Sequence, residues 1–357
     1  MIGRNESIVK KKLFVFIAAF LVSLSVLASV VTAETGDTSA NRAGMISSLM
    51  DLIKSANKTE PALPTASPLP TEAPQETAPP KDDNIYIKVY FHREGVIKSI
   101  ALDEYIQGVL YGEVPETYHA EALKAQAIAA RSYTVYRINH YASHDNGADV
   151  CTDYTHCQAW TAAENGIYPD SIRSAVAETR HMIGTYEGKC INALYFSNSG
   201  GYTEAIENVW GGAPYPYLTS VESPGEAGNY DFCNVKYFTA EEFVSKICAY
   251  SGITECNEDD AVSNISKIKR SESGRVLSAE IAGTTFTGQQ LRAMFGTLSA
   301  NIYFKRVNED AVAVVSLGYG HGVGMSQCGA QAMAESGADC ETILKHYYKG
   351  IELEQYA

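Results

Sequence analysis

The sequence has 357 residues, of which 45% are hydrophobic and 20% charged, as expected for a globular protein of one large or two ordinary domains. Its formal net charge is −14. This excludes the broad basic surface that general nucleic-acid binding requires, so we expect no nucleic-acid partner.

The N-terminus carries the pattern of an export signal. Lys10, Lys11 and Lys12 precede an uncharged, largely apolar run over residues 13–33. The run is about as long as a bilayer span requires, although its end, Val31-Thr32-Ala33, also resembles a signal-peptidase site. We therefore expect residues 1–33 to be a membrane anchor, with a cleaved signal segment as the alternative. Lysines on the short side of the run place the rest of the chain outside the cytoplasm.

Residues 34–83 predict a disordered tether. The stretch over residues 58–83 is rich in Pro, Thr, Ala and Glu, so it cannot bury a core and should be extended. The folded domain is expected over residues 84–357. A single anchor followed by such a spacer would hold this domain at the cell membrane, on its outer side.

The expected domain begins with strand signals and then changes to a helical period. Residues 85–91 and 96–102 are rich in β-branched and aromatic side chains, which predicts two strands. From Leu102 onward apolar residues recur at helical spacing, and one further turn places Glu113 on the same apolar face. Burial would raise the pKa of this carboxyl and suit it to general-acid chemistry. The alternative is a solvated glutamate at a fraying helix end.

An alanine-rich helix is predicted over residues 119–141. Lys124 and Arg131 are seven residues apart, so they share one face of it, and apolar residues border that face on both sides. We expect partly buried cations aimed at a polar group. The alternative is that both side chains snorkel over the core.

At this point the residues resemble a known family. The run YIQGVLYGEVPETYHAEALKAQAIAARSY resembles the signature of the SpoIID/LytB family of sporulation proteins. Three further blocks follow in order: YFSNSGGYTE at residues 195–204, VWGG at 209–212 and GHGVGMSQCGAQAMAESG at 320–337. The resemblance covers residues 85–351, which is essentially the whole expected domain.

The resemblance implies a lytic transglycosylase that acts on peptidoglycan glycan strands already stripped of stem peptides. Such an enzyme cleaves the bond between N-acetylmuramic acid and N-acetylglucosamine and leaves 1,6-anhydro ends, here in septal wall remodelling during sporulation engulfment. The other implied class is a non-catalytic wall-binding module that activates an amidase. Other sporulation wall-remodelling proteins, an amidase among them, are therefore the expected partners.

The resemblance also implies residue roles. Glu113 corresponds to the catalytic acid and base, and Lys124 and Arg131 correspond to active-site residues. The later blocks are expected to line the glycan, which implies substrate contacts for Ser197, Ser199, Thr203, His321, Ser326 and Gln327. Ser197 and Ser199 do not stand in G-x-S-x-G, so a hydrolase nucleophile is not indicated.

A metal site is predicted in the loop after the second helix. His144, Cys151, His156 and Cys157 lie within fourteen residues and make a Cys2His2 set that could hold tetrahedral Zn²⁺, with His140 as a substitute for His144. The role would be structural or orienting, because four protein ligands leave no open position. Some members of the resembled family hold zinc in such a loop. The alternative is a Cys151–Cys157 disulfide.

Residues 318–327, GYGHGVGMSQ, alternate glycine with other residues. Their spacing fits neither a dinucleotide-binding loop nor a P-loop, so we expect a backbone that another surface approaches closely. A Cys328–Cys340 disulfide is conceivable nearby. Residues 232–268 are expected to be helical and then irregular, with a helical pattern over 240–251. Together these patterns predict an α+β fold with short strands and a helical pair that carries the catalytic glutamate.

Overall fold

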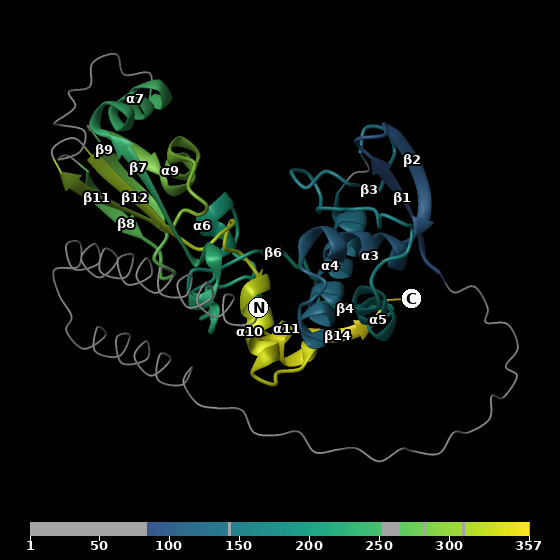
Figure 1. The fold of residues 1–357 in the computed structure, drawn as a ribbon. Helices are drawn as coiled ribbons and strands as arrows, with labels where there is room; N and C mark the ends of the chain where they lie inside the picture. Colours follow the sequence, from purple (N-terminus) through teal and green to yellow (C-terminus); the bar gives the residue numbers. More distant parts are fainter. Residues whose placement is uncertain (1–83, 142–143, 252–264, 282, 309–310, 357) are drawn as a thin grey trace, which may run out of the picture. The chain divides into compact units, whose positions relative to one another are not determined.

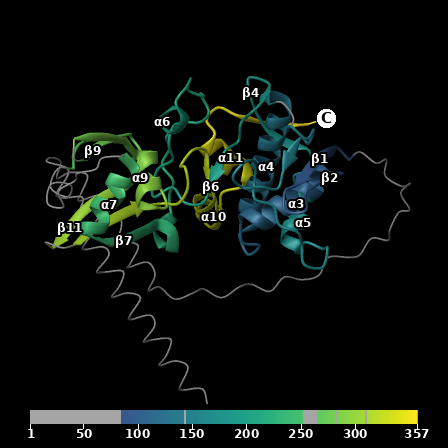
Figure 2. The same cartoon turned by 90° about the horizontal axis from the view of Figure 1, so that it is seen from above.

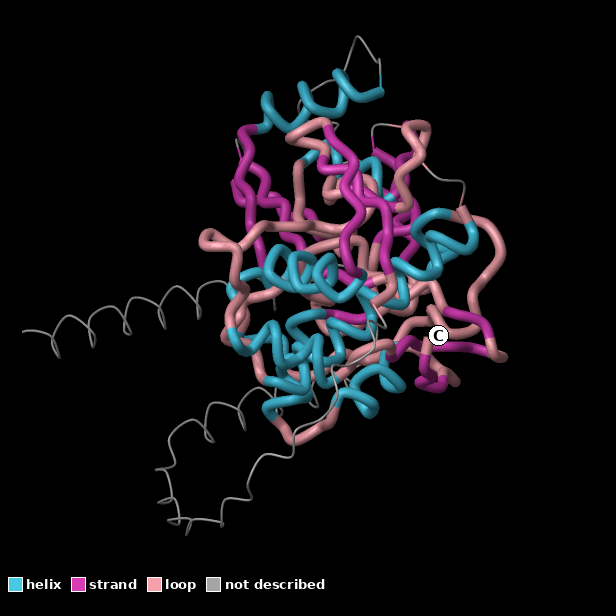
Figure 3. The backbone as a smooth tube through the Cα atoms, turned by 90° about the vertical axis from the view of Figure 1, so that its right-hand side faces the viewer, coloured by secondary structure: helices cyan, strands magenta, loops and turns pink. Residues whose placement is uncertain are grey.

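The computed structural model describes residues 84–141, 144–251, 265–281, 283–308 and 311–356 (Figure 1). The expected anchor and tether lie outside these residues. Helices and several small sheets make up the described chain, as Figure 3 shows, which confirms a mixed α and β composition. None of the helices in these ranges is both long and apolar enough to span a bilayer.

The first layer is a three-stranded sheet with helices beside it. Strand β1 (Tyr86–Phe91) pairs antiparallel with β2 (Val96–Ala101) and parallel with β3 (Val150–Cys151). Helix α3 (Leu102–Glu113) follows β2 directly, and α4 (Ala120–His140) and α5 (Asp170–Glu178) pack against it (Figures 1 and 2). Both predicted strands and both predicted helices are confirmed to within one residue.

Apolar periodicity explains why α3 forms and where it packs. Its stripe of Leu102, Tyr105, Ile106 and Val109 is buried in one hydrophobic cluster with residues of α4. The opposite, small-residue face of α4 lies in a second cluster with α10 (Gln327–Glu335) and α11 (Cys340–Tyr347). Helix α4 therefore stands between α3 and the C-terminal helices, and its alanines allow the close contact.

Two small sheets connect these helices to the later sequence blocks. Strand β6 (Tyr195–Phe196) pairs in parallel with β13 (Met325–Ser326), which leads directly into α10. Strand β4 (Met182–Tyr186) lies between β5 (Lys189–Cys190) and β14 (Glu352–Gln355). The β6–β13 pair brings together the two blocks that the sequence analysis placed around a glycan.

Apart from the short helix α6 (Ile206–Trp210) and two single-turn helices, the remaining elements form two antiparallel sheets with helices. One has the order β11 (Ile302–Asn308), β12 (Ala311–Leu317), β7 (Cys233–Thr239), and the other has the order β10 (Thr284–Thr287), β9 (Val276–Ile281), β8 (Ser266–Arg270). Helices α7 (Ala240–Ser251) and α9 (Gly288–Phe295) share their core. The expected helix at 240–251 is confirmed. The expectation of helix before it was wrong, because residues 233–239 pair with β12 along the whole of β7 and pairing overrides local preference.

The glycine-rich segment packs against the chain itself. A Cβ on Gly324 would lie 1.9 Å from the carbonyl oxygen of Leu194, and one on Gly322 would lie 2.5 Å from the guanidinium carbon of Arg275. Both glycines also have positive φ, at +82° and +91°. The close approach predicted from the sequence is thus made by residues of this protein, and side chains there would collide with it.

Candidate active site

Glu113 is the last residue of α3, and its carboxyl is held from two other parts of the chain. Oε1 accepts a hydrogen bond of 2.8 Å from the backbone amide of Ala159, and Oε2 accepts one of 3.3 Å from the side-chain amide of Gln327. Burial raises the pKa of Glu113, while these two bonds and the nearby hydroxyl of Tyr195 act in the opposite direction. Burial is the larger effect, so the carboxyl holds its proton to a higher pH than an exposed glutamate does.

Tyr195 belongs to this site although the sequence analysis gave it no role. Its hydroxyl donates a hydrogen bond of 2.7 Å to Gln158, whose own amide donates one of 2.9 Å to Thr134 of α4. This polar chain fixes Tyr195 beside the carboxyl of Glu113. The positions of two residues in the sequence could have indicated this role. Tyr195 is the first residue of the 195–204 block, and Gln158 directly follows Cys157 of the expected metal site.

The arrangement can hold and transfer one proton. The groups around the Glu113 carboxyl are a backbone amide, a side-chain amide and a hydroxyl, all of them neutral. Such partners stabilise the carboxylate after it has given up its proton, without forcing it to be ionised beforehand.

Lys124 and Arg131 are not brought to Glu113. Arg131 is fully buried and donates to Asp103 at 3.0 Å and to the carbonyl of Thr179 at 2.8 Å. Asp103 lies in the first turn of α3 and Glu113 is the last residue, which puts them roughly 15 Å apart along the helix. Lys124 forms ion pairs of 2.9 Å with Glu121 and 2.6 Å with Glu178. Both cations therefore tie α4 to its neighbours.

Three of the expected sugar ligands are buried and already paired within the chain. Ser199 donates to Glu226 through its backbone amide at 2.8 Å and through its hydroxyl at 2.6 Å. Ser326 also donates to Glu226, and it caps α10 by accepting from Gly329. Thr203 donates to the carbonyl of Thr219 at 3.2 Å. Glu226, which sequence reasoning missed, thus fastens the 195–204 block to the start of α10.

The other expected contacts are placed differently. The imidazole of His321 lies between the rings of Phe196 and Trp210, with ring centroids 5.5 and 5.1 Å away. The carbonyl of Ser197 accepts a hydrogen bond of 2.9 Å from Cys328 and thereby anchors α10. Of the later-block side chains named from the sequence, Gln327 is the one whose hydrogen bond reaches Glu113 within the described ranges.

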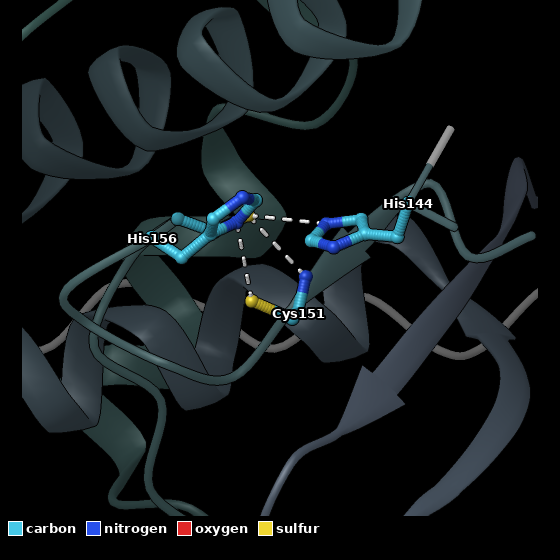
Figure 4. A group of neighbouring side chains, drawn as sticks. His144, Cys151 and His156 are labelled. Carbon is cyan, nitrogen blue, oxygen red and sulfur yellow. Dashed lines mark hydrogen bonds between the residues drawn. The ribbon is translucent and has the colours of Figure 1, made fainter. Parts of the chain in front are cut away.

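The four predicted metal ligands converge in space. Their donor atoms all lie within 4.8 Å of one another. His156 Nδ1 is 3.7 Å from Cys151 Sγ and 3.4 Å from Cys157 Sγ, and His144 Nε2 is 3.5 Å from Cys157 Sγ. Figure 4 shows the imidazoles of His144 and His156 close to each other beside Cys151.

This geometry fits a tetrahedral ion. Ligands bound to zinc at about 2.0–2.3 Å lie about 3.3–3.8 Å apart in a tetrahedron, which matches the three separations above. The hydrogen bond from Cys157 lowers the pKa of Cys151 to about 5, so a thiolate is available at neutral pH. Both thiols are free. The Cys328–Cys340 disulfide considered from the sequence was wrong, since these thiols are free as well.

The sequence is similar to known sporulation proteins over most of its length. Residues 90–186 match the family model of SpoIID, described as "Stage II sporulation protein". The chain is 34% identical over 285 residues to stage II sporulation protein D of Bacillus amyloliquefaciens, an alignment that covers 77% of this chain and 80% of that protein. It is 36% identical over 288 residues to the protein of the same name from Bacillus subtilis, with the same coverage. It is also 27% identical to the amidase enhancer of B. subtilis, over 70% of this chain and 40% of that protein.

Proposed function

This chain belongs to the SpoIID family of sporulation proteins, and from that premise we propose that it is a lytic transglycosylase acting on peptidoglycan glycan strands. The observation that carries the proposal is the carboxyl of Glu113. It is partly buried, its pKa is raised by that burial, and neutral hydrogen-bond partners contact it.

One carboxyl is sufficient for the proposed reaction. Protonated Glu113 donates its proton to the glycosidic oxygen as the bond from that oxygen to C1 of N-acetylmuramic acid breaks. The C6 hydroxyl of the same sugar then attacks C1, and the Glu113 carboxylate takes the hydroxyl proton. The products are a 1,6-anhydro end and a free 4-hydroxyl, and Glu113 is protonated again. A hydrolytic glycosidase would need a second carboxylate for a water or for covalent attack.

The partners of Glu113 support both steps. The amides of Ala159 and Gln327 donate hydrogen bonds that stabilise the transient carboxylate. The hydroxyl of Tyr195 lies beside the same carboxyl and would donate to it by turning its single proton away from Gln158. The hydrogen bond from Tyr195 to Gln158 holds the phenol ring in place beside the carboxyl of Glu113.

Product analysis with purified glycan strands tests the reaction. The wild-type domain should release anhydro ends, which mass spectrometry separates from hydrated ends by the mass of one water. Glu113→Gln should abolish these products while the circular dichroism spectrum stays unchanged. Hydrated products from the wild type, or full activity of Glu113→Gln, would contradict the assignment.

A second candidate function is favoured by the similarity to the amidase enhancer. In that case the domain would bind glycan and activate an amidase without cleaving strands itself. Incubation of the purified domain with denuded strands separates the two functions, because cleavage without a partner supports the enzyme and binding without cleavage supports the activator.

The proposal also includes a structural zinc site and a membrane anchor. His144, Cys151, His156 and Cys157 would hold Zn²⁺ in a structural role, because four protein ligands fill a tetrahedral site.

The apolar run at 13–33, which follows three lysines, would anchor the chain in the cell membrane with residues 84–357 outside the cytoplasm. Fractionation of cells that express the full chain, followed by protease treatment of intact protoplasts, tests this placement.

A further inference from the structure

Residues 157–161 lie directly against α3 at two glycines of its last turns. The amide of Thr161 donates a hydrogen bond of 3.0 Å to the carbonyl of Gly108. A Cβ on Gly108 would lie 2.0 Å from the indole nitrogen of Trp160, and one on Gly112 would lie 3.1 Å from the backbone nitrogen of the same residue. This close approach fixes the backbone of residues 157–161 relative to the C-terminal end of α3.

Two consecutive residues of this segment hold the acid and its neighbour. The backbone amide of Ala159 donates a hydrogen bond of 2.8 Å to Glu113. The side-chain oxygen of Gln158 accepts one of 2.7 Å from the hydroxyl of Tyr195. Tyr195 belongs to the β6–β13 pair, and that pair leads directly to Gln327, which donates at 3.3 Å to the same carboxyl. The hydroxyl of Tyr195 therefore lies beside the carboxyl of Glu113.

The hydrogen bonds behind Tyr195 all run in one direction. Thr134 donates its single hydroxyl proton to the carbonyl of Ala130 at 2.8 Å, so its oxygen accepts from any other partner. It accepts from the side-chain amide of Gln158 at 2.9 Å, and this turns the carbonyl oxygen of Gln158 toward Tyr195. Thr134 and Gln158 are buried, so solvent does not compete for either bond.

This arrangement commits the proton of Tyr195. A phenol has one proton, and Tyr195 donates it to Gln158. The oxygen of Tyr195 therefore presents lone pairs to Glu113, and these accept from the protonated acid. Tyr195 lowers the pKa of Glu113 only when it donates to the carboxylate, and it must break its bond to Gln158 to do so.

The other titratable groups that act on Tyr195 are phenols. Tyr105 on α3, Tyr133 on α4 and Tyr348 after α11 interact with it, and burial raises the pKa of all three, so they are neutral at pH 7. Tyr105 and Tyr348 also donate their protons to backbone carbonyls, at 3.3 and 2.7 Å. Within the described part of the chain, the direction of the hydrogen bonds therefore decides how Tyr195 acts on Glu113.

We propose that Gln158 is a positioning residue for the acid: it accepts the hydroxyl proton of Tyr195 and thereby prevents Tyr195 from donating to Glu113. The acid then keeps its proton until a glycosidic oxygen takes it. After this transfer Tyr195 donates to the carboxylate only by losing its bond to Gln158, so the carboxylate stays basic enough to accept the proton of the C6 hydroxyl. The inference rests on the proposed function for the reaction, but not for the direction of the hydrogen bonds.

The ionisation of Glu113 can be measured without cleavage. In the full chain labelled with carbon-13 at the glutamate carboxyls, the Glu113 signal is assigned by its absence in Glu113→Gln and followed against pH by NMR. We expect Gln158→Leu to move the midpoint of this titration down by roughly one pH unit, because Tyr195 then donates to the carboxylate. In a cleavage assay the limb of kcat/KM that falls as pH rises should move down with it.

Further variants separate this role from a general structural one. Thr134→Val removes the oxygen that orients Gln158, so the amide can turn over and the midpoint should move down in part. Thr134→Ser keeps the hydroxyl and should titrate like the wild type. In a Tyr195→Phe background Gln158→Leu should cause no further movement, because no hydroxyl proton is left to redirect.

An unchanged or higher midpoint in Gln158→Leu, or an equal downward movement with and without the Tyr195 hydroxyl, would overturn the positioning role. If Gln158→Leu does not fold, an unchanged midpoint in Thr134→Val has the same force. A downward movement that needs Tyr195 supports the role even if the wild type releases no anhydro ends, because the titration is read without cleavage. Absence of anhydro ends would then contradict the proposed reaction alone.

Discussion

Gln327 and Glu113 are 214 positions apart in the sequence, and a hydrogen bond of 3.3 Å joins their side chains. Gln327 is the first residue of α10, whose start is fixed by Ser326 and Glu226, and Glu113 is the last residue of α3. The end of one helix and the beginning of another therefore meet at the proposed acid.

Gln327→Ala should move the pH dependence of cleavage to higher pH. The Gln327 amide stabilises the carboxylate and lowers the pKa of Glu113, so its removal raises that pKa further. Since the first step needs the protonated acid, the limb of kcat/KM that falls as pH rises should shift upward. Gln331→Ala is the matched control, because Gln331 lies one turn later in α10 and contacts His119 and Glu335. A shift to lower pH in Gln327→Ala would contradict the assignment.

Glu113→Gln should stabilise the fold at neutral pH relative to the wild type. The folded-state pKa of Glu113 lies above its unfolded value of about 4.3, so the folded state binds this proton more tightly. The wild type then loses stability as pH rises from the unfolded pKa through the folded one. Urea denaturation should show a difference between the two proteins at pH 7 that disappears below about pH 4. Glu116→Gln, at an exposed position, controls for the change of charge.

Removal of zinc should disturb Glu113 as well as the metal loop. Ala159, whose amide donates a hydrogen bond of 2.8 Å to Glu113, follows two residues after Cys157, which belongs to the proposed zinc site. We expect one zinc per chain by elemental analysis and a loss of cleavage on chelation or in His144→Ala. At a hundredfold excess of free zinc over Kd, binding should stabilise the fold by about 2.7 kcal/mol. Cys233→Ser, at a free thiol elsewhere, should keep its zinc. Zinc-free protein with oxidised Cys151 and Cys157 would refute the site.

Arg131→Ala and Lys124→Ala should differ strongly in stability. Removing fully buried Arg131 takes a donor from the carbonyls of Thr179, Met182 and Val176. Asp103 also loses this donor but keeps its ion pair of 3.3 Å with Arg180, so the change should cost about 3 kcal/mol in urea denaturation. The ion pairs of Lys124 are partly exposed, so its loss should cost about 1 kcal/mol or less. A loss of cleavage in Lys124→Ala at unchanged stability would show instead that this lysine contacts the glycan.

Comparing Gly322→Ala with Gly212→Ala separates the stability cost of backbone strain from the cost of a steric clash. Both glycines have positive φ, at +91° and +85°, so alanine should cost about 1–2 kcal/mol at either position. A Cβ at Gly322 would also meet the guanidinium of Arg275 at 2.5 Å, whereas nothing lies within 4 Å of one at Gly212. Thermal unfolding should therefore show a further loss of about 1–3 kcal/mol at Gly322. Equal losses at the two positions would mean that Arg275 moves aside without cost.

Local patterns were sufficient for several features. Apolar residues at helical spacing over 102–110 predicted helix α3, and one further turn placed Glu113 at the end of its buried stripe. The metal set could be read from the sequence because its four members lie within fourteen residues, where the loop connects them at small entropic cost. In both cases the relevant neighbours are close along the chain.

The tertiary structure decided everything that depends on distant segments. It placed Ala159, Tyr195 and Gln327 next to the carboxyl of Glu113. It also brought Ser199 and Ser326 into hydrogen bonds with Glu226 and paired residues 233–239 with β12 as a strand. A polar side chain in a glycine-rich block has the same local sequence whether it meets a sugar or a buried carboxylate. Only the packing of the rest of the chain determines which of these it reaches, because burial requires each polar group to find a partner within the fold.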